Sequence, residues 1–68
     1  MVDSEMLIAA IKKAGYTIDA FAQKLGMSRS TLWRKIYGKG VFDLDEMNRI
    51  IDYLDIKEPR TIFLINKF

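Results

Sequence analysis

The sequence predicts an all-α fold of five short helices. Apolar residues recur at intervals of three and four, which is the spacing of a helix with one buried face. Helix-capping residues and glycines divide this pattern into short segments. A chain of 68 residues buries only roughly 60% of the surface that its unfolded form exposes, so its core is small. We therefore expect a single domain, residues 1–68, with room for one functional site.

The first helix is predicted over about residues 4–14. Asp3 or Ser4 is the expected N-cap, and Gly15 stands where a left-handed residue ends many helices. The apolar residues of this helix recur at three- and four-residue spacing and are Leu7, Ile8, Ala10, Ile11 and Ala14. We expect them to form its inward face.

Gly26 separates two further helices, predicted over residues 17–25 and 28–37. Each begins at a good N-cap residue, Thr17 and Ser28 respectively. Because glycine takes a positive φ without steric cost, the chain can turn sharply here. The residues on the inward sides of the two helices are Phe21, Ala22, Leu25, Met27, Leu32 and Ile36. This arrangement predicts a helix-turn-helix over about residues 17–38.

The outward side of residues 28–37 carries no acid. A helix that needed only solubility would carry pairs of Glu and Lys four residues apart. Here the guanidinium groups of Arg29 and Arg34 have the fork geometry that bonds guanine O6 and N7. The other outward residues are Ser30, Trp33 and Tyr37. Ser28, Ser30 and Thr31 supply hydroxyl groups at the start of the helix. These residue types favour double-stranded DNA as the ligand, with this helix in the major groove.

Charge is segregated along the chain. Residues 24–39 contain five Lys or Arg and no acid, whereas residues 43–58 contain six acids and two bases, a net charge of −4. The overall net charge of +2 therefore conceals a basic segment. Such a segment is typical of a surface that binds a polyanion. A solvated helix face that is merely basic is the alternative, and charge alone does not separate the two.

The fourth helix is predicted to begin at Asp43, which forms a capping box with Glu46 three residues later. Phe42 precedes the cap and is expected to pack on Met47. The apolar stripe of this helix is expected in the core and consists of Leu44, Met47, Ile50, Ile51 and Leu54. Its acidic residues would repel DNA, so we expect the helix on the far side of the domain.

The last helix is predicted over residues 59–66, with Pro59 at its first position. It carries many apolar residues for the end of a small chain, among them Ile62, Phe63 and Ile65. Some of them close the core, and any surplus would leave an exposed patch of the kind that often marks a partner surface. We therefore expect a homodimer formed through residues 59–66.

Several function classes are disfavoured by composition. The chain has no cysteine and no histidine, so it lacks a thiol nucleophile, a thiolate zinc site and the commonest general base. We expect no catalytic site, no metal site, no cofactor and no small-molecule ligand. The N-terminus does not match a signal peptide. The longest apolar run, residues 62–65, is far shorter than the roughly 20 residues that span a bilayer, so a soluble cytoplasmic protein is expected.

Residues 17–38 resemble the helix-turn-helix of the Cro and lambda-type repressor family, often called the XRE family. That family has a small Ala in the first helix, Gly at the turn, then apolar-Ser-polar-Ser-Thr-apolar and a closing Gly. The matching residues here are Ala22, Gly26, Met27, Ser28, Arg29, Ser30, Thr31, Leu32 and Gly38. The other helices resemble the five-helix form of small phage regulators, so the resemblance implies a lambda-repressor-like fold.

The resemblance implies that residues 28–37 form the recognition helix, with Arg29, Ser30 and Arg34 reading bases. Backbone contacts are implied for Ser28, Thr31, Tyr37 and Lys39. Relatives often place a phosphate-contacting glutamine where this chain has Ile18, and Thr17 is the candidate to replace that contact. Trp33 either flanks the sugar-phosphate backbone or covers the core.

Two functions remain open at this point. The first is a sequence-specific transcription regulator of phage or prophage origin, similar to Cro or a repressor. The second is a protein-interaction module that keeps the fold, such as an antitoxin or adaptor. The acid-free segment, residues 24–39, favours the first and the apolar tail mildly favours the second.

Overall fold

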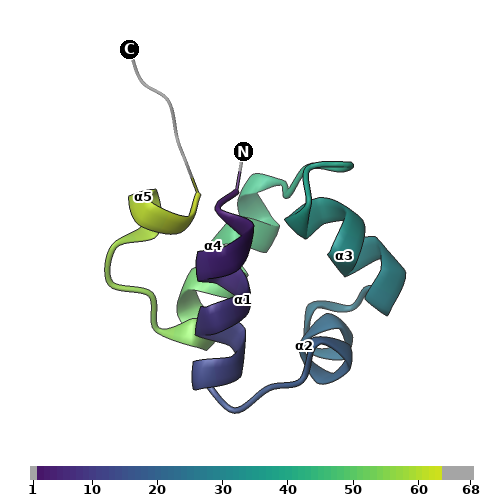
Figure 1. Ribbon diagram of the computed structural model, residues 1–68, viewed down its shortest axis with the longest axis horizontal. Helices are drawn as coiled ribbons and strands as arrows, with labels where there is room; N and C mark the ends of the chain where they lie inside the picture. Colours follow the sequence, from purple (N-terminus) through teal and green to yellow (C-terminus); the bar gives the residue numbers. More distant parts are fainter. Residues whose placement is uncertain (1, 64–68) are drawn as a thin grey trace.

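The computed structural model describes residues 2–63, while residue 1 and residues 64–68 are not described. The elements are α1 (Ser4–Lys13), α2 (Ile18–Leu25), α3 (Arg29–Ile36), α4 (Leu44–Leu54) and α5 (Pro59–Ile62). Figure 1 shows α4 running behind α1, with α2 and α3 on one side of this pair and α5 on the other. The predicted all-α fold with a helix-turn-helix is confirmed. Within residues 2–63, no helix is long and apolar enough to cross a membrane.

The predicted N-caps are present. The Asp3 carboxylate accepts a hydrogen bond from the Met6 amide at 3.1 Å, the Thr17 hydroxyl accepts from the Ala20 amide at 3.0 Å, and the Ser28 hydroxyl accepts from the Thr31 amide at 3.1 Å. Each cap satisfies an amide that the first turn of a helix leaves without an intrahelical partner. The helix starts that the sequence predicts are therefore confirmed.

The turn between α2 and α3 depends on Gly26. This residue has a φ of +78°, in the left-handed region, and its amide donates back to the carbonyls of Ala22 and Gln23. A residue with a Cβ would be strained in this conformation. Gly26 therefore ends α2 and sets the direction in which α3 departs.

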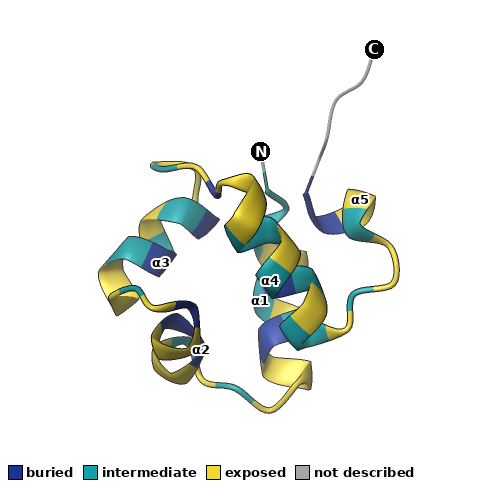
Figure 2. Ribbon diagram, turned by 180° about the vertical axis from the view of Figure 1, so that it is seen from behind, coloured by how far each residue is buried: buried dark blue, intermediate teal, exposed yellow. Residues whose placement is uncertain are grey.

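The core lies where α1 faces α2 and α5, and where α2 faces α3 and α4. Figure 2 shows the buried residues on the inward sides of the helices. They are Leu7, Ile11, Phe21, Ala22, Leu25, Leu32, Ile36, Phe42, Ile50, Ile62 and Phe63. Because Leu32 and Ile36 are both fully enclosed, the opposite side of α3 must face outward.

Two residues predicted to be inward lie in solvent instead. Ala14 is exposed because it is the C-cap of α1, beyond the part of that helix that the core covers. Leu44 is 70% exposed. It is the first residue of α4, and Phe42, two residues earlier, takes the buried position and packs edge-on against the Phe63 ring at 6.2 Å between centroids.

The last helix is shorter than predicted. It ends at Ile62, and Phe63 is extended and forms an antiparallel bridge with Val2. The Asp3 amide also donates to the Ile62 carbonyl at 2.7 Å. Ile62 and Phe63 are buried, so they close the core and leave no apolar surplus at these positions. The rest of the predicted helix, including Ile65, lies outside the described residues.

Candidate nucleic-acid interface

The outer face of α3 is defined by Arg29, Ser30, Trp33, Arg34 and Tyr37. Four of these residues are exposed and Trp33 is half-buried; the exposed ones include the three predicted base-reading residues, Arg29, Ser30 and Arg34. Among the described residues, none forms a hydrogen bond or ion pair with the side chains of these three. Their donors are therefore available to a ligand.

The hydroxyl groups at the start of α3 are partly engaged within the helix. Besides accepting from the Thr31 amide, the Ser28 hydroxyl donates to the Thr31 hydroxyl oxygen at 2.9 Å. The two hydroxyl groups are thus hydrogen-bonded to each other within the first turn of α3, and Ser28 also serves as its cap.

Trp33 and Tyr37 form a stacked pair on the outer face of α3. Their ring centroids are 5.3 Å apart and their planes differ by 18°. Trp33 is half-buried and packs against the core, while Tyr37 is 55% exposed. Trp33 therefore covers the core, and its stacking partner extends an aromatic surface toward solvent. The four-residue spacing of the two rings is the signal from which this pair could have been predicted.

A hollow opens beside the outer face of α3, where the end of α1, the start of α2 and the start of α3 meet. Residues from all three helices line it: Lys12, Tyr16, Thr17, Ile18, Asp19, Arg29 and Trp33. The N-terminus of α2 faces this hollow, and its amides and dipole favour an anion. Lys12 and Arg29 add positive charge, which Asp19 partly offsets. Lys12 was not predicted because it lies on α1, outside the helix-turn-helix.

An ion pair joins α3 to α4. The Lys35 ammonium donates to both oxygens of the Glu46 carboxylate at 2.8 Å, and the two side chains are only 20% and 16% exposed. Glu46 also accepts from the Asp43 amide at 3.0 Å, which completes the predicted capping box. Lys35 is therefore directed into the contact between α3 and α4, away from the outer face of α3.

α4 also holds the end of α2. The Arg49 guanidinium donates to the Leu25 carbonyl at 3.1 Å and to the Lys24 carbonyl at 3.4 Å, and it lies 3.5 Å from the Asp45 carboxylate. A hydrogen bond with the Tyr53 side chain is the main reason that the pKa of Arg49 lies above its ordinary value. The guanidinium group, a cation at all ordinary pH values, meets the negative end of the α2 dipole.

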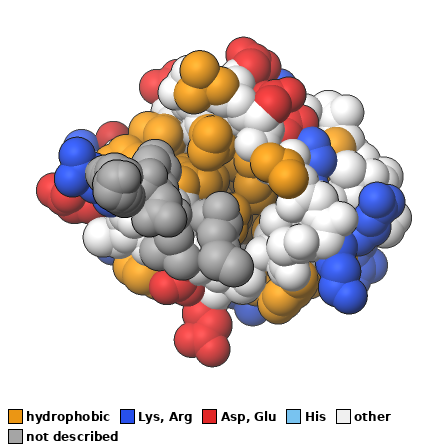
Figure 3. Space-filling model, turned by 90° about the horizontal axis from the view of Figure 1, so that it is seen from above, with side chains coloured by type: hydrophobic (Ala, Val, Ile, Leu, Met, Phe, Trp, Pro, Cys, Tyr) orange, Lys and Arg blue, Asp and Glu red, His pale blue; other side chains and the backbone are white. Residues whose placement is uncertain are grey.

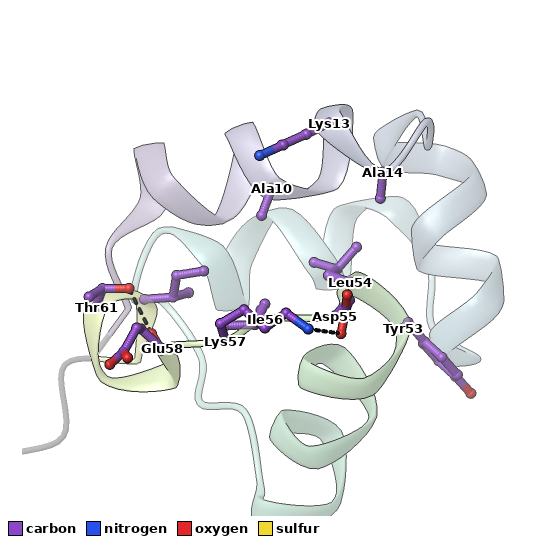
Figure 4. Close-up of a pocket in the computed structure, with 11 residues that line it drawn as sticks. Ala10, Lys13, Ala14, Tyr53, Leu54, Asp55, Ile56, Lys57, Glu58 and Thr61 are labelled. Carbon is purple, nitrogen blue, oxygen red and sulfur yellow. Dashed lines mark hydrogen bonds and ion pairs between the residues drawn. The ribbon is translucent and has the colours of Figure 1, made fainter.

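Basic side chains gather at one edge of the surface. Figure 3 shows a group of Lys and Arg side chains at the edge where α3 lies, whereas acidic side chains are spread over other edges and, at the opposite end, lie beside basic ones. A second hollow, shown in Figure 4, lies between α1 and the segment that joins α4 to α5, on the side of the molecule away from α3. Its charged residues include the pair Lys57 and Asp55, 3.1 Å apart. In residues 2–63, no cluster of acidic, His or Cys side chains could hold a metal.

The exposed basic helix and the turn that positions it define a class: a helix-turn-helix protein that binds DNA and regulates transcription. The chain belongs to the bacterial regulatory protein, Fis family, whose model matches residues 1–37. The match covers α1, α2 and α3 and stops at Tyr37, the C-cap of α3. No curated protein and no solved structure matches the chain. The narrower resemblance to the Cro and lambda-type repressors stays a prediction.

Proposed function

We propose that the chain is a sequence-specific regulator that reads the major groove of double-stranded DNA with α3. Arg29, Ser30 and Arg34 contact base edges, and the two arginines are suited to guanine O6 and N7. The observation that carries this proposal is the outer face of α3, which combines two exposed guanidinium groups with no acid. A protein surface of this kind gains most from a ligand that is negatively charged and rich in acceptors.

Backbone contacts position the helix in the groove. Thr31, Tyr37 and Lys39 donate to phosphate oxygens from α3 and the residues that follow it. Thr17 and Lys12 meet a second phosphate at the hollow beside α2, where the helix N-terminus favours an anion. Ser28 serves first as the cap of α3 and only weakly as a phosphate donor. Trp33 lines the same hollow, where it would flank the sugar-phosphate backbone.

The narrower assignment is a phage or prophage regulator of the Cro or repressor type, acting in the cytoplasm. It is supported by the resemblance of residues 17–38 to the helix-turn-helix of that family. One α3 helix contacts few bases, and each bidentate contact contributes only about 1–3 kcal/mol of discrimination. Two copies on a two-fold operator, with half-sites about 10 base pairs apart, would supply the remaining specificity.

A protein-interaction module, such as an antitoxin or adaptor, is the second candidate. Val41 and Leu44 favour it, because both are large apolar side chains that stand in solvent. A module of this kind would bind a protein through these residues and would not need the exposed guanidinium groups of α3.

Selection of bound duplexes from a random pool tests the proposal. We expect an enriched, two-fold symmetric motif, and an affinity for it that falls steeply as salt rises, because phosphate binding releases counterions. Recovery of no motif, together with DNA binding that does not depend on salt, would favour the interaction module instead.

A further inference from the structure

The Ser4 hydroxyl contacts a helix other than the one that Ser4 begins. Asp3 caps α1, so the Ser4 hydroxyl is not needed there. It donates instead to the Ile36 carbonyl at 2.7 Å, in a partly buried position and across 32 residues of the chain. Among the described residues, it is the only hydrogen bond that joins α1 to α3. Figure 1 shows the start of α1 and the end of α3 at the same end of the molecule.

The Ile36 carbonyl is one of the four that the last turn of α3 leaves without a partner inside the helix. The other three accept hydrogen bonds from amides in the chain that follows: Tyr37 to Trp33, Gly38 to Lys35 and Lys39 to Arg34. Within residues 2–63, no backbone amide donates to the Ile36 carbonyl. Ser4 therefore supplies the donor that the turn after α3 does not provide.

Ser4 is a fixed donor, because the residues before it are held by the core. The Asp3 amide donates to the Ile62 carbonyl at 2.7 Å, and Val2 forms its bridge with Phe63. Ile62 and Phe63 are themselves buried. The Ser4 hydroxyl can therefore hold the end of α3 against the body of the domain.

We infer that Ser4 is a positioning residue for Arg34. By binding the Ile36 carbonyl, it keeps the last turn of α3 where the Arg34 guanidinium reaches its base. The inference rests on the proposed function, because it concerns the base that Arg34 reads. Ile36 lies about 3 Å along the helix axis from Arg34 and about 10 Å from Arg29. A movement at the end of α3 should therefore impair base reading by Arg34 and spare that by Arg29, since a bidentate contact needs both donor-acceptor distances near about 2.9 Å.

The test compares variants that remove the Ser4 hydroxyl with one that keeps it. Ser4→Ala removes the donor, Ser4→Cys replaces it with a weak one at similar size, and Ser4→Thr retains it. Thr61→Ala is the matched control. The Thr61 hydroxyl also donates to a backbone carbonyl at 2.7 Å, that of Glu58, but this bond lies at α5. Thermal melting checks that each variant folds.

Titration of the operator and of its single-base variants measures discrimination at each base pair. Arg34→Ala and Arg29→Ala identify the base pair that each arginine reads. We expect Ser4→Ala and Ser4→Cys to lose about three- to tenfold in discrimination at the Arg34 base pair and none at the Arg29 base pair. Ser4→Thr and Thr61→Ala should keep both. Ser4→Ala should have no further effect on an Arg34→Ala chain and its full effect on an Arg29→Ala chain.

Amide hydrogen exchange of the free protein gives a second measurement that does not depend on DNA. The Tyr37 and Lys39 amides close the last turn of α3, whereas the Leu32 amide donates to the Ser28 carbonyl at its start. Ser4→Ala should raise the exchange rates of Tyr37 and Lys39 several-fold more than that of Leu32, because only the end of the helix loses a contact.

Equal losses at both base pairs, or exchange raised equally at both ends of α3, would mean that Ser4 only stabilises the fold and would overturn the inference. Full discrimination in a folded Ser4→Ala chain would overturn it as well. In both cases the arginine variants still lose their base preferences, so the proposed function stands. If the wild-type chain binds no duplex, the proposed function fails and the inference fails with it.

Discussion

The outer face of α3 and the inner face of α4 both carry charged side chains, and they differ in what those side chains contact. On α4, Glu46 binds Lys35 of α3, and Arg49 binds carbonyls at the end of α2. On α3, Arg29 and Arg34 are exposed and have no hydrogen-bond or ion-pair partner among the described residues. The charges on the inner face of α4 are used for structure, whereas those on the outer face of α3 are left for a ligand.

Substitutions on these two faces should therefore have different effects, one on stability and the other on DNA affinity. Removing a charge from the inner face of α4 leaves its partner in α2 or α3 without compensation, so it should lower stability. Removing a charge from the outer face of α3 should lower DNA affinity and leave stability nearly unchanged, as is usual for exposed positions. Each of the following substitutions tests one side of this comparison.

Glu46→Ala is expected to have the largest effect. It leaves the half-buried Lys35 ammonium unpaired and removes half of the capping box, so the free energy of unfolding should fall by about 2–4 kcal/mol. Chemical denaturation measures this change. Glu46→Gln is the control, because glutamine can still accept from the Asp43 amide. It should lose less stability than the alanine variant, and equal losses would show that the ion pair, and not the cap, carries the effect.

Arg34→Ala should act on DNA binding alone. Loss of one bidentate base contact weakens operator binding by about 1–3 kcal/mol and relaxes the preference at one base pair. Titration of the operator and of single-base variants, at fixed salt, measures both effects. The melting temperature should stay within a degree or two of the wild-type value. A large drop in melting temperature would mean that Arg34 has a structural role and would contradict the comparison.

Arg49→Met should lower stability by less than Glu46→Ala. Methionine keeps much of the aliphatic stem but cannot donate to the carbonyls of Leu25 and Lys24, so the end of α2 loses its cation. Asp45→Ala is the comparison variant. It removes the exposed ion pair to Arg49, a kind that contributes little, and one of the two acids in the first turn of α4, whose interaction with the helix dipole is also small. Thermal melting should rank the two variants in that order. If Asp45→Ala lowers the melting temperature more than Arg49→Met does, the contribution of Arg49 to stability does not come from its contacts with the two carbonyls.

The sequence predicts the features of this fold that depend on neighbouring residues. The caps at Thr17 and Ser28 and the turn at Gly26 follow from local chemistry, and the structure confirms them. The outward direction of Arg29 and Arg34 follows as well, because Leu32 and Ile36 fix the inward side of a regular helix. The contact of these arginines with DNA stays a prediction.

Features that depend on distant parts of the chain could not be predicted in the same way. The pairing of Lys35 with Glu46 requires α3 and α4 to meet at a particular angle. The spacing of apolar residues within each helix does not predict the angle between the two helices. The same limit explains Leu44, which fits the apolar stripe of α4 but lies beyond the edge of the core. It also explains why Lys12, on α1, was not expected at the hollow beside α2.

Lys39→Ala should have the smallest effect and the least dependence on sequence. Lys39 is exposed in the connection that follows α3, where an ammonium group can meet a phosphate but cannot reach a base edge from within the helix. Its loss should weaken operator and mixed duplexes by the same few-fold factor and reduce the slope of log affinity against log salt by about one. Titrations of both duplexes at several salt concentrations measure these quantities. A loss confined to the operator would assign Lys39 to base reading and would extend the ligand-binding surface of α3 beyond its C-terminal end.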